Sequence, residues 1–271
     1  MLVKVGCCGF PMARAEYYQR FAVVEVQQTF YNLPRIPTGE RWRQEALAQR
    51  SQHGRAHFEF TMKAWQLITH EPSSPTYRRL RKVIPEAEKG LYGGFQQTEP
   101  VLRAWGETAA FARALGVTIV LFQCPPRFTP TPTHVENLRN FFRIIDRKDF
   151  VAAWEPRGEW PPEMVRKLCS ELDLVHVVDP LKQLPQSDGL RYFRLHGMTG
   201  YRYLHTDQDL QAVAEQCIGG LPTYVLFNNQ FMGEDALRLQ KLVAQPGLAA
   251  RSALTFACPA RPGGIGDTGM E

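Results

Sequence analysis

Hydrophobic and polar positions along the chain alternate between two kinds of segment. Short runs rich in Val, Ile, Leu and Phe are typical of buried strands, whereas longer stretches with apolar residues three or four positions apart are typical of helices. The pattern predicts eight strands, at Val3–Cys8, Val23–Tyr31, His57–Lys63, Val117–Gln123, Phe150–Glu155, Leu174–Asp179, Leu190–His196 and Thr223–Asn228. Seven helices are predicted between them, at Ala13–Arg20, Gly39–Gln52, Pro100–Leu115, Thr133–Asp146, Pro161–Leu172, Asp207–Cys217 and Gly233–Val243.

This order of elements predicts the fold class. Strands that alternate with helices form a parallel sheet. Eight such units in 271 residues favour an α/β fold with a single (β/α)8 TIM barrel over a doubly wound sheet. No GxGxxG or GxxxxGK[ST] follows a strand, so the usual reason to expect a nucleotide-binding sheet is absent.

Two segments depart from the regular alternation. Residues 70–98 form an insertion after the third strand that is too long for an ordinary connection. We expect it to act as a lid, with Gly93 and Gly94 as its hinge. Residues 246–271 are rich in Gly, Pro and Ala and are predicted to be a loosely ordered tail. The barrel domain is therefore expected to span residues 1–245.

Composition and charge narrow the possible partners. The formal charge of +5 favours anionic partners without requiring them. No run of 18 apolar residues exists, so no membrane partner is expected. The N-terminal sequence MLVKVGCCGF reads as a first strand rather than a signal peptide, and the six cysteines show no CxxC spacing. We therefore expect reduced thiols and a cytoplasmic protein, with the oligomeric state open.

Polar side chains recur where the predicted strands end. Catalytic residues of TIM barrels lie at the C-terminal ends of the strands. Here those ends, with the residues directly after them, carry Glu25, Lys63, Gln123, Glu155, Arg157, Asp179, Arg194, His196, Asn228 and Asn229. A charge inside a barrel requires a partner. We therefore expect a polar ring at the barrel mouth in which Glu25 meets Lys63 or Arg194, with a purely structural network as the alternative.

The ring suits a small anionic ligand, phosphorylated or carboxylated. Guanidinium groups bind phosphate and carboxylate, and amides supply neutral contacts. The candidate ligand-binding residues are Arg157, Arg194, Asp179, Asn228, Asn229 and Gln123. An ion pair with Glu155 is the alternative role of Arg157. The candidate acid/base catalytic residues are Glu25, Glu155, His196 and Lys63. No cofactor is expected.

Two other functions remain open. A metal-assisted phosphodiesterase would draw its ligands from Glu25, His70, Glu155, Asp179, His196 and His205, but no HxH or HExxH is present and no metal is expected. A nucleic-acid-binding protein would use the basic and aromatic residues of the insertion, Tyr77, Arg78, Arg79, Arg81 and Lys82. A solvated basic surface is the alternative for that segment.

An ordered set of motifs resembles one known family. GCCGF, VEVQQTFYNLP, FTMKAWQLITH, IVLFQCPP, WEPRGEW, VVDP, FRLHG and YVLFNN occur in this order. The chain resembles the YecE-like family, domain-of-unknown-function family 72, from about Val3 to Leu242. The resemblance implies a TIM barrel and no particular activity. Family members usually have Ser or Thr where this chain has Cys7 and Cys8, and Asn-Ser where it has Gln27 and Gln28.

Overall fold

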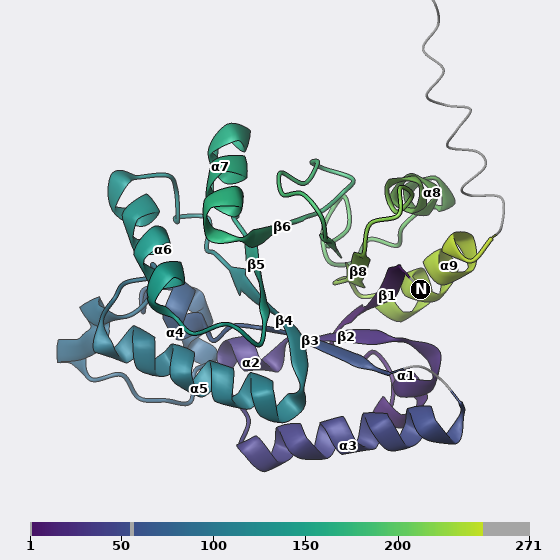
Figure 1. Ribbon diagram of the computed structural model, residues 1–271, viewed down its shortest axis with the longest axis horizontal. Coiled ribbons are helices and arrows are strands. Elements are labelled where there is room, and N and C mark those ends of the chain that lie inside the picture. Colours follow the sequence, from purple (N-terminus) through teal and green to yellow (C-terminus); the bar gives the residue numbers. More distant parts are fainter. Residues whose placement is uncertain (1, 55–56, 246–271) are drawn as a thin grey trace, which may run out of the picture.

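The computed structural model describes residues 2–54 and 57–245. Within them, eight parallel strands pair in chain order and close into a barrel (Figure 1). The strands are β1 (Val3–Cys8), β2 (Val23–Val26), β3 (Glu59–Lys63), β4 (Val117–Gln123), β5 (Val151–Glu155), β6 (Leu174–Val178), β7 (Arg191–Leu195) and β8 (Thr223–Phe227). The predicted (β/α)8 barrel is confirmed.

Helices surround the barrel (Figure 1). The longer ones are α1 (Arg14–Arg20), α3 (Ile36–Gln52), α5 (Glu99–Leu115), α6 (Pro132–Ile144), α7 (Pro162–Leu172), α8 (Asp207–Gln216) and α9 (Met232–Val243). Short turns of helix, α2 (Gln28–Tyr31) and α4 (Gln66–Thr69), follow β2 and β3. As predicted, the segment between β6 and β7 contains no helix.

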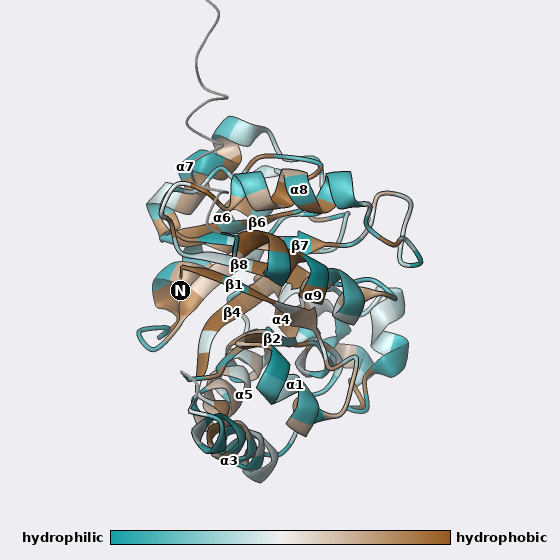
Figure 2. Cartoon of the chain, turned by 90° about the vertical axis from the view of Figure 1, so that its right-hand side faces the viewer, coloured by the Kyte–Doolittle hydropathy of each residue, from teal (hydrophilic) through white to brown (hydrophobic). Residues whose placement is uncertain are grey.

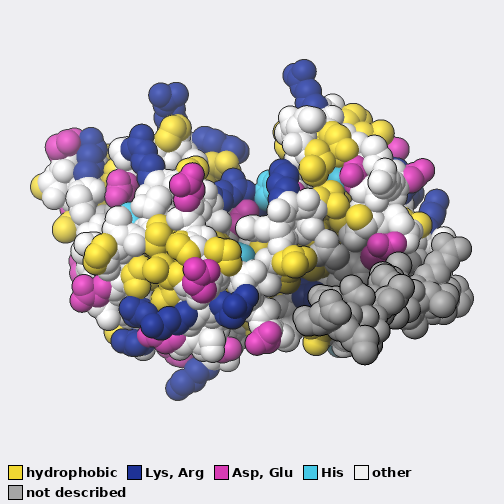
Figure 3. Space-filling view, turned by 90° about the horizontal axis from the view of Figure 1, so that it is seen from above, with side chains coloured by type: hydrophobic (Ala, Val, Ile, Leu, Met, Phe, Trp, Pro, Cys, Tyr) yellow, Lys and Arg dark blue, Asp and Glu magenta, His cyan; other side chains and the backbone are white. Residues whose placement is uncertain are grey.

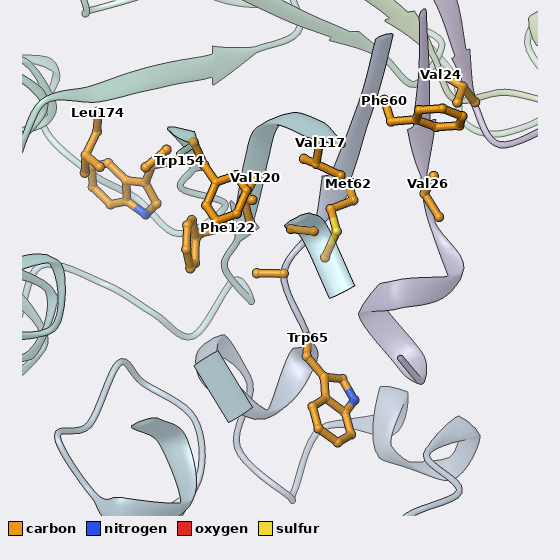
Figure 4. Close-up of a cluster of buried hydrophobic side chains, with 14 of the residues drawn as sticks. Val24, Val26, Phe60, Met62, Trp65, Val117, Val120, Phe122, Trp154 and Leu174 are labelled. Atoms are coloured by element: carbon orange, nitrogen blue, oxygen red, sulfur yellow. The ribbon is translucent and has the colours of Figure 1, made fainter. Parts of the chain in front are cut away.

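The outer faces of the strands pack against the helices. Alternate strand residues such as Phe60, Met62, Phe122 and Trp154 point into this layer and are almost completely buried (Figure 4). Burying each such side chain contributes about 1.5–3 kcal/mol. Figure 2 shows the strands coloured as hydrophobic and surrounded by helices of mixed colour, as expected for helices with one face on the core and one in water.

The inner faces of the strands are layered along the barrel. At the N-terminal end, Lys4 donates hydrogen bonds to Glu59 and Tyr224 across the barrel. An apolar layer fills the middle, made of Ile119, Leu121, Ala153, Val175, Val177 and Leu226. The Tyr192 and Tyr224 rings stack with centroids 5.8 Å apart. The C-terminal mouth is therefore separated from the polar cluster at the other end.

The hydrogen-bonded seams differ in length. β7 and β8 align over five residues, from Arg191 with Thr223 to Leu195 with Phe227. By contrast, β1 and β2 align at Cys7 with Val24 and Cys8 with Glu25. β6 and β7 likewise align over two residues of each strand, 177–178 and 192–193. The β1–β2 and β6–β7 seams are thus the short ones.

The predicted second strand was too long. β2 ends at Val26, and residues Gln28–Tyr31 form the helical turn α2. The Thr29 hydroxyl donates to the Val26 and Lys63 carbonyls, which stabilises the turn against the end of β3. Phe30 and Tyr31 have a high strand propensity, but this local hydrogen bonding overrides it.

The insertion after β3 is anchored to the barrel. It contains two 3₁₀ segments, η1 (Pro75–Arg79) and η2 (Glu86–Leu91). The N–H groups of Gly93, Gly94 and Phe95 donate to carbonyls of α4, at 2.9, 3.3 and 3.0 Å. The glycine pair therefore forms a packed turn, and the lid role of the insertion stays a prediction.

Three other expectations meet the structure only in part. The tail at residues 246–271 lies outside the described residues. Five of the six cysteines are described, and these are buried free thiols. Among the described residues, no helix has the length and apolar character needed to cross a membrane.

We predict that Gly93→Ala destabilises the protein by about 3 kcal/mol, because it combines backbone strain with a steric clash. Gly93 has φ of +82°, and an added Cβ would lie 2.4 Å from the His70 carbonyl carbon. Gly94→Ala is the matched control, with φ of +57° and open space at Cβ. It should cost about 1 kcal/mol from strain alone. Urea unfolding measures both, and equal losses would contradict the clash.

Candidate functional site

Arg194 lies at the centre of the barrel mouth. Its side chain points inward from β7 and is completely buried. The guanidinium contacts Glu25 on β2 through Nε at 3.1 Å and Nη2 at 3.0 Å. Nη1 donates to Glu155 Oε2 at 2.6 Å. Two carboxylates from different strands thus share one guanidinium. These ion pairs compensate the cost of burying Arg194, which would be prohibitive without them.

Glu25 is held from several sides. Tyr192 donates its hydroxyl proton to Oε2 at 2.7 Å, and Gln27 donates to Oε1. The Tyr192 oxygen also lies 2.8 Å from the Thr61 hydroxyl. The carboxylate is therefore fixed by hydrogen bonds as well as by Arg194. Glu25 is buried on a strand because it is the ion-pair partner of Arg194.

Glu155 links Arg194 to a second arginine. Arg157 donates from Nε and Nη2 to Glu155 Oε1, at 3.1 and 3.0 Å. Burial alone would raise the pKa of Glu155, but Arg194 and Arg157 outweigh it and lower the pKa to about 2. Glu155 is therefore ionised at neutral pH. As an ion-pair partner it cannot act as a proton donor there.

His196 is a neutral imidazole in this arrangement. Its Nε2 lies 2.9 Å from Arg157 Nη2 and 3.3 Å from Arg194 Nη1. Burial, together with the charge of Arg194, lowers the pKa of His196 to about 3. Because guanidinium groups only donate, Nε2 must accept, and the ring proton is assigned to Nδ1. His196 can then donate from Nδ1 but cannot accept a proton at Nε2 without losing these contacts.

Lys63 is the exception among the charged residues of the mouth. It lies at the end of β3, is 5% exposed, and its ammonium sits 3.9 Å from the centre of the Phe30 ring. In the described part of the chain it forms no ion pair. Burial, reinforced by Arg194, lowers the pKa of Lys63 to about 7. A substantial fraction of Lys63 is therefore an uncharged amine at neutral pH.

The remaining predicted residues divide into two groups. Gln123 Oε1 lies 3.4 Å from Arg194 Nη1, within the mouth. Asp179 accepts from the N–H groups of Leu181 and His196 and pairs with Lys182 at 3.7 Å, so it fixes the turn after β6. Asn228 is half-buried at the end of β8, where its N–H donates to the Leu195 carbonyl.

Asn229 belongs to a different network. Its amide donates to Asp235 at 2.8 Å and to the Tyr203 carbonyl at 2.7 Å. Asp235 also contacts His205 Nδ1 at 2.7 Å, and both side chains are fully buried. These residues connect the segment after β7 to α9. The structure therefore does not bring Asn229 to the mouth.

The candidate metal ligands are not arranged around a common metal position within the described residues. His70 packs edge-on against Phe30, with ring centroids 4.9 Å apart. Burial, with Lys63 adding to it, lowers the pKa of His70 to about 3. His205 is engaged with Asp235. Within residues 2–54 and 57–245, no group of three His, Cys, Asp or Glu side chains is placed to hold a metal ion.

The candidate site residues predicted from the sequence did not include three residues of the site. Tyr192 holds Glu25, Thr61 contacts Tyr192, and the Phe30 ring supports Lys63. Tyr192 lies two positions before Arg194 on the same strand, so alternation along β7 could have identified it. Phe30 could not be found in this way, because it was assigned to a strand and lies on α2.

The site opens to solvent on one side. Arg157 and His196 keep 35% and 28% of their side-chain surface exposed, whereas Glu155 keeps 9%. Figure 3 shows a hollow between two raised parts of the surface, with histidine, basic and acidic side chains gathered at its floor. The arrangement can therefore present the uncharged imidazole of His196 and the guanidinium of Arg157 to a ligand.

A comparison with protein families identifies the chain. The family described as "Protein of unknown function DUF72" matches residues 13–260, and the chain belongs to this family. The resemblance seen in the sequence is thereby confirmed. No curated protein matches the chain.

Solved structures share the fold. A DUF72 family protein from Enterococcus faecalis is 21% identical, with a TM-score of 0.64 over 90% of this chain and 98% of that one. A DUF72 family protein from Thermotoga maritima is 18% identical, with a TM-score of 0.59 over 90% and 100%. A xylose isomerase domain containing protein from Salmonella typhimurium is 13% identical, with a TM-score of 0.52 over 91% and 97%. At these identities the likeness extends to the fold alone.

We predict that Arg194→Met lowers the free energy of unfolding at pH 7 by about 3–5 kcal/mol, because Glu25 and Glu155 lose their shared cation. The folded-state pKa of Glu155, about 2, lies below its ordinary 4.5. Its ionised form therefore contributes stability that is complete above pH 4.5 and is lost as the pH falls toward 2. The deficit of the variant should shrink over the same range.

Denaturant unfolding at several pH values measures this deficit. Arg103→Met is the control, since it removes an exposed ion pair with Glu99 on α5. Such a pair contributes less than about 1 kcal/mol. An Arg194→Met protein as stable as the control at pH 7 would show that the buried pairs are dispensable.

Proposed function

We propose that this DUF72 protein binds a small anionic ligand, phosphorylated or carboxylated, at the C-terminal mouth of its barrel and acts on it by acid/base chemistry. One observation carries the proposal: Lys63 is buried in the mouth without a carboxylate partner, although the mouth contains two buried carboxylates. A buried cation without a counter-ion is costly unless a ligand supplies one.

The balance of charges in the mouth favours an anionic ligand. Glu25 and Glu155 are neutralised by Arg194 and Arg157. Asp179 is paired with Lys182 at the rim. Protonated Lys63 then gives the mouth one excess positive charge, and an anionic group would balance it.

Arg157 is the second group suited to the anion. Its Nε and Nη2 are engaged with Glu155 and His196, while Nη1 has no hydrogen-bond partner in the described residues. Arg194 differs, since all three of its nitrogens have partners inside the barrel. We therefore assign ligand binding to Arg157 and Lys63, and the ordering of the mouth to Arg194.

Acid/base chemistry falls to Lys63. A group with a pKa of about 7 can both accept and return a proton at neutral pH. Glu155 stays ionised, and its oxygens accept from two arginines. His196 offers a neutral donor from Nδ1, which suits an oxygen that gains negative charge during the reaction.

We predict that Arg157→Gln weakens binding of the phosphorylated ligand at least about tenfold, because a hydrogen bond to a charged group contributes about 1.5–3 kcal/mol. The measurement is calorimetry with inorganic phosphate and a panel of sugar phosphates and small carboxylates. Lys182→Met is the matched control, since it removes a rim cation that already has a carboxylate partner. Comparable weakening in both variants would indicate attraction by overall charge, and unchanged binding in Arg157→Gln would remove Arg157 from the site.

A nucleic-acid-binding function is the second candidate, supported by unpaired cations on the insertion. Arg78, Arg79, Arg81 and Lys82 are exposed, and none has a carboxylate partner among the described residues. Arg79 stacks 3.6 Å from the Tyr31 ring centre. Arg79 and Arg81 line a groove of about 510 Å³ that also includes Gln27, the hydrogen-bond partner of Glu25. A strand of nucleic acid could follow this groove to the mouth.

If so, the double variant Arg78→Gln/Arg81→Gln should bind a single-stranded oligonucleotide more weakly and with a smaller salt dependence. The slope of log affinity against log salt should fall by about 1.4, because each phosphate that the protein no longer neutralises lowers it by about 0.7. Fluorescence anisotropy at several salt concentrations measures the slope. The control pair Arg166→Gln/Lys167→Gln on α7 should leave it unchanged. An unaltered slope in the first variant would mean that the insertion does not bind phosphates.

A further inference from the structure

We infer that Lys63 is a nucleophile that forms an imine with a small aldehyde or ketone carrying a phosphate or carboxylate group. The inference rests on the proposed anion site and specifies the class of its ligand. It is based on the position of Lys63, the groups around its ammonium, and a comparison with a second lysine inside the same barrel.

The ammonium of Lys63 is accessible from the mouth. Lys63 is the last residue of β3, and Glu59 and Thr61 of that strand contact residues across the barrel interior. Alternation therefore directs Lys63 inward at the C-terminal end. Its nitrogen has no hydrogen-bond partner among the described residues. The side-chain nitrogen and oxygen atoms that lack both a partner and contact with solvent do not include it. The 5% of Lys63 that is exposed thus includes the nitrogen.

The surroundings of Lys63 favour an uncharged amine with an available lone pair. The Phe30 ring covers one side of the nitrogen and keeps water away. Arg194 and Arg157 add positive charge nearby, which disfavours the ammonium form. Desolvation and a neighbouring cation are the two means by which proteins make lysine nucleophilic. Both act on this side chain.

Lys4 provides an internal comparison. It also points into the barrel, but at the N-terminal end, where Glu59 and Tyr224 accept its protons. Burial alone would lower the pKa of Lys4, yet these two partners hold it above its ordinary value. Lys4 is therefore a structural cation. Two lysines inside one barrel thus have opposite environments, and the one without partners lies where barrel enzymes place their reactive groups.

The thiols of the mouth do not compete for this role. Cys8 is buried, and its Sγ lies 3.7 Å from Arg194 Nη2. Burial, with Glu25 adding to it, raises the pKa of Cys8 well above its ordinary value. Burial also raises the pKa of Cys124. Since the thiolate is the reactive form, both thiols are inert at neutral pH.

The proposed step balances without a co-reactant. The amine nitrogen of Lys63 adds its lone pair to the carbonyl carbon, and the carbonyl π bond becomes a C–OH group after one N–H proton moves to oxygen. Loss of that hydroxyl with the second N–H proton releases one water and leaves a C=N bond. Arg157 would hold the phosphate or carboxylate of the substrate. Uptake of one proton from solvent then converts the imine to an iminium, and the nearby Glu25 and Glu155 carboxylates favour this cation.

Borohydride trapping tests the inference. The wild-type protein is incubated with dihydroxyacetone phosphate or glyoxylate and reduced, and peptides are mapped by mass spectrometry. Glycerol 3-phosphate and glycolate are the matched controls, because each has an alcohol where the probe has a carbonyl. At limiting probe, modification of Lys63 should exceed that of Lys4 and Lys182 at least about tenfold, since an ordinary lysine with pKa ~10.4 is almost fully protonated at pH 7.

Two further readouts separate a reactive residue from a structural one. The trapping rate at Lys63 should rise with pH to a plateau, with a midpoint near its pKa of about 7. Lys63→Met, whose unbranched side chain can still pack on Phe30, should remove the adduct while the variant still folds, as measured by urea unfolding. Lys182→Met should leave the Lys63 adduct intact.

The outcomes are distinct. An adduct on Lys63 with a carbonyl probe and none with the alcohols supports the inference. Calorimetric binding of glycerol 3-phosphate or glycolate without any Lys63 adduct from the carbonyl probes would overturn the imine while the proposed anion site stands. Failure of all four compounds to bind, with no adduct, would overturn both. Adducts spread equally over exposed lysines would show that Lys63 has no special reactivity.

Discussion

The architecture of the mouth depends on one buried guanidinium. Arg194 crosses the barrel interior from β7 and contacts carboxylates on β2 and β5. None of these three charges could be buried alone, since the desolvation of each ion costs several kcal/mol. Arg157 supplies the second positive charge through Glu155, and the four side chains together form a neutral group that closes the apolar interior toward the mouth. The ionisation states of the other residues follow from this group.

The ionisation states of these side chains determine which of them can exchange protons. The two arginines hold Glu155 as a carboxylate, and burial together with the same arginines holds His196 as a neutral imidazole. The same positive charge, added to burial, leaves Lys63 close to half protonated at neutral pH. A mouth rich in acids and bases thereby contains a single group that exchanges protons readily near pH 7 among its described residues. The reactivity of Lys63 therefore depends on burial and on the charges around it, and an exposed lysine would not share it.

The sequence predicted the barrel well because periodicity and element order carry that information. Polar residues at strand ends predicted that Glu25 meets Lys63 or Arg194, since strand ends of a closed barrel must converge, and the structure selects Arg194. Asn229 was misplaced because it follows Asn228 beyond the end of β8, where a buried network with Asp235 holds it away from the mouth. The unpaired state of Lys63 could not be predicted either. It depends on which of the nearby basic side chains, Arg157, Arg194 or Lys63, the two carboxylates contact. Distances in the folded structure decide this.

The short seams of the barrel give Arg194 a mechanical role. The β1–β2 and β6–β7 seams divide the strands into one group, β2 to β6, and another, β7, β8 and β1. Glu25, Lys63 and Glu155 lie in the first group, and Arg194 and His196 lie in the second. The ion pairs of Arg194 therefore join the two groups at the mouth, while the backbone ladder between them is short. Any motion that parts the two groups to admit a ligand must break these ion pairs, together with the hydrogen bonds that join Tyr192 to Glu25 and His196 to Arg157.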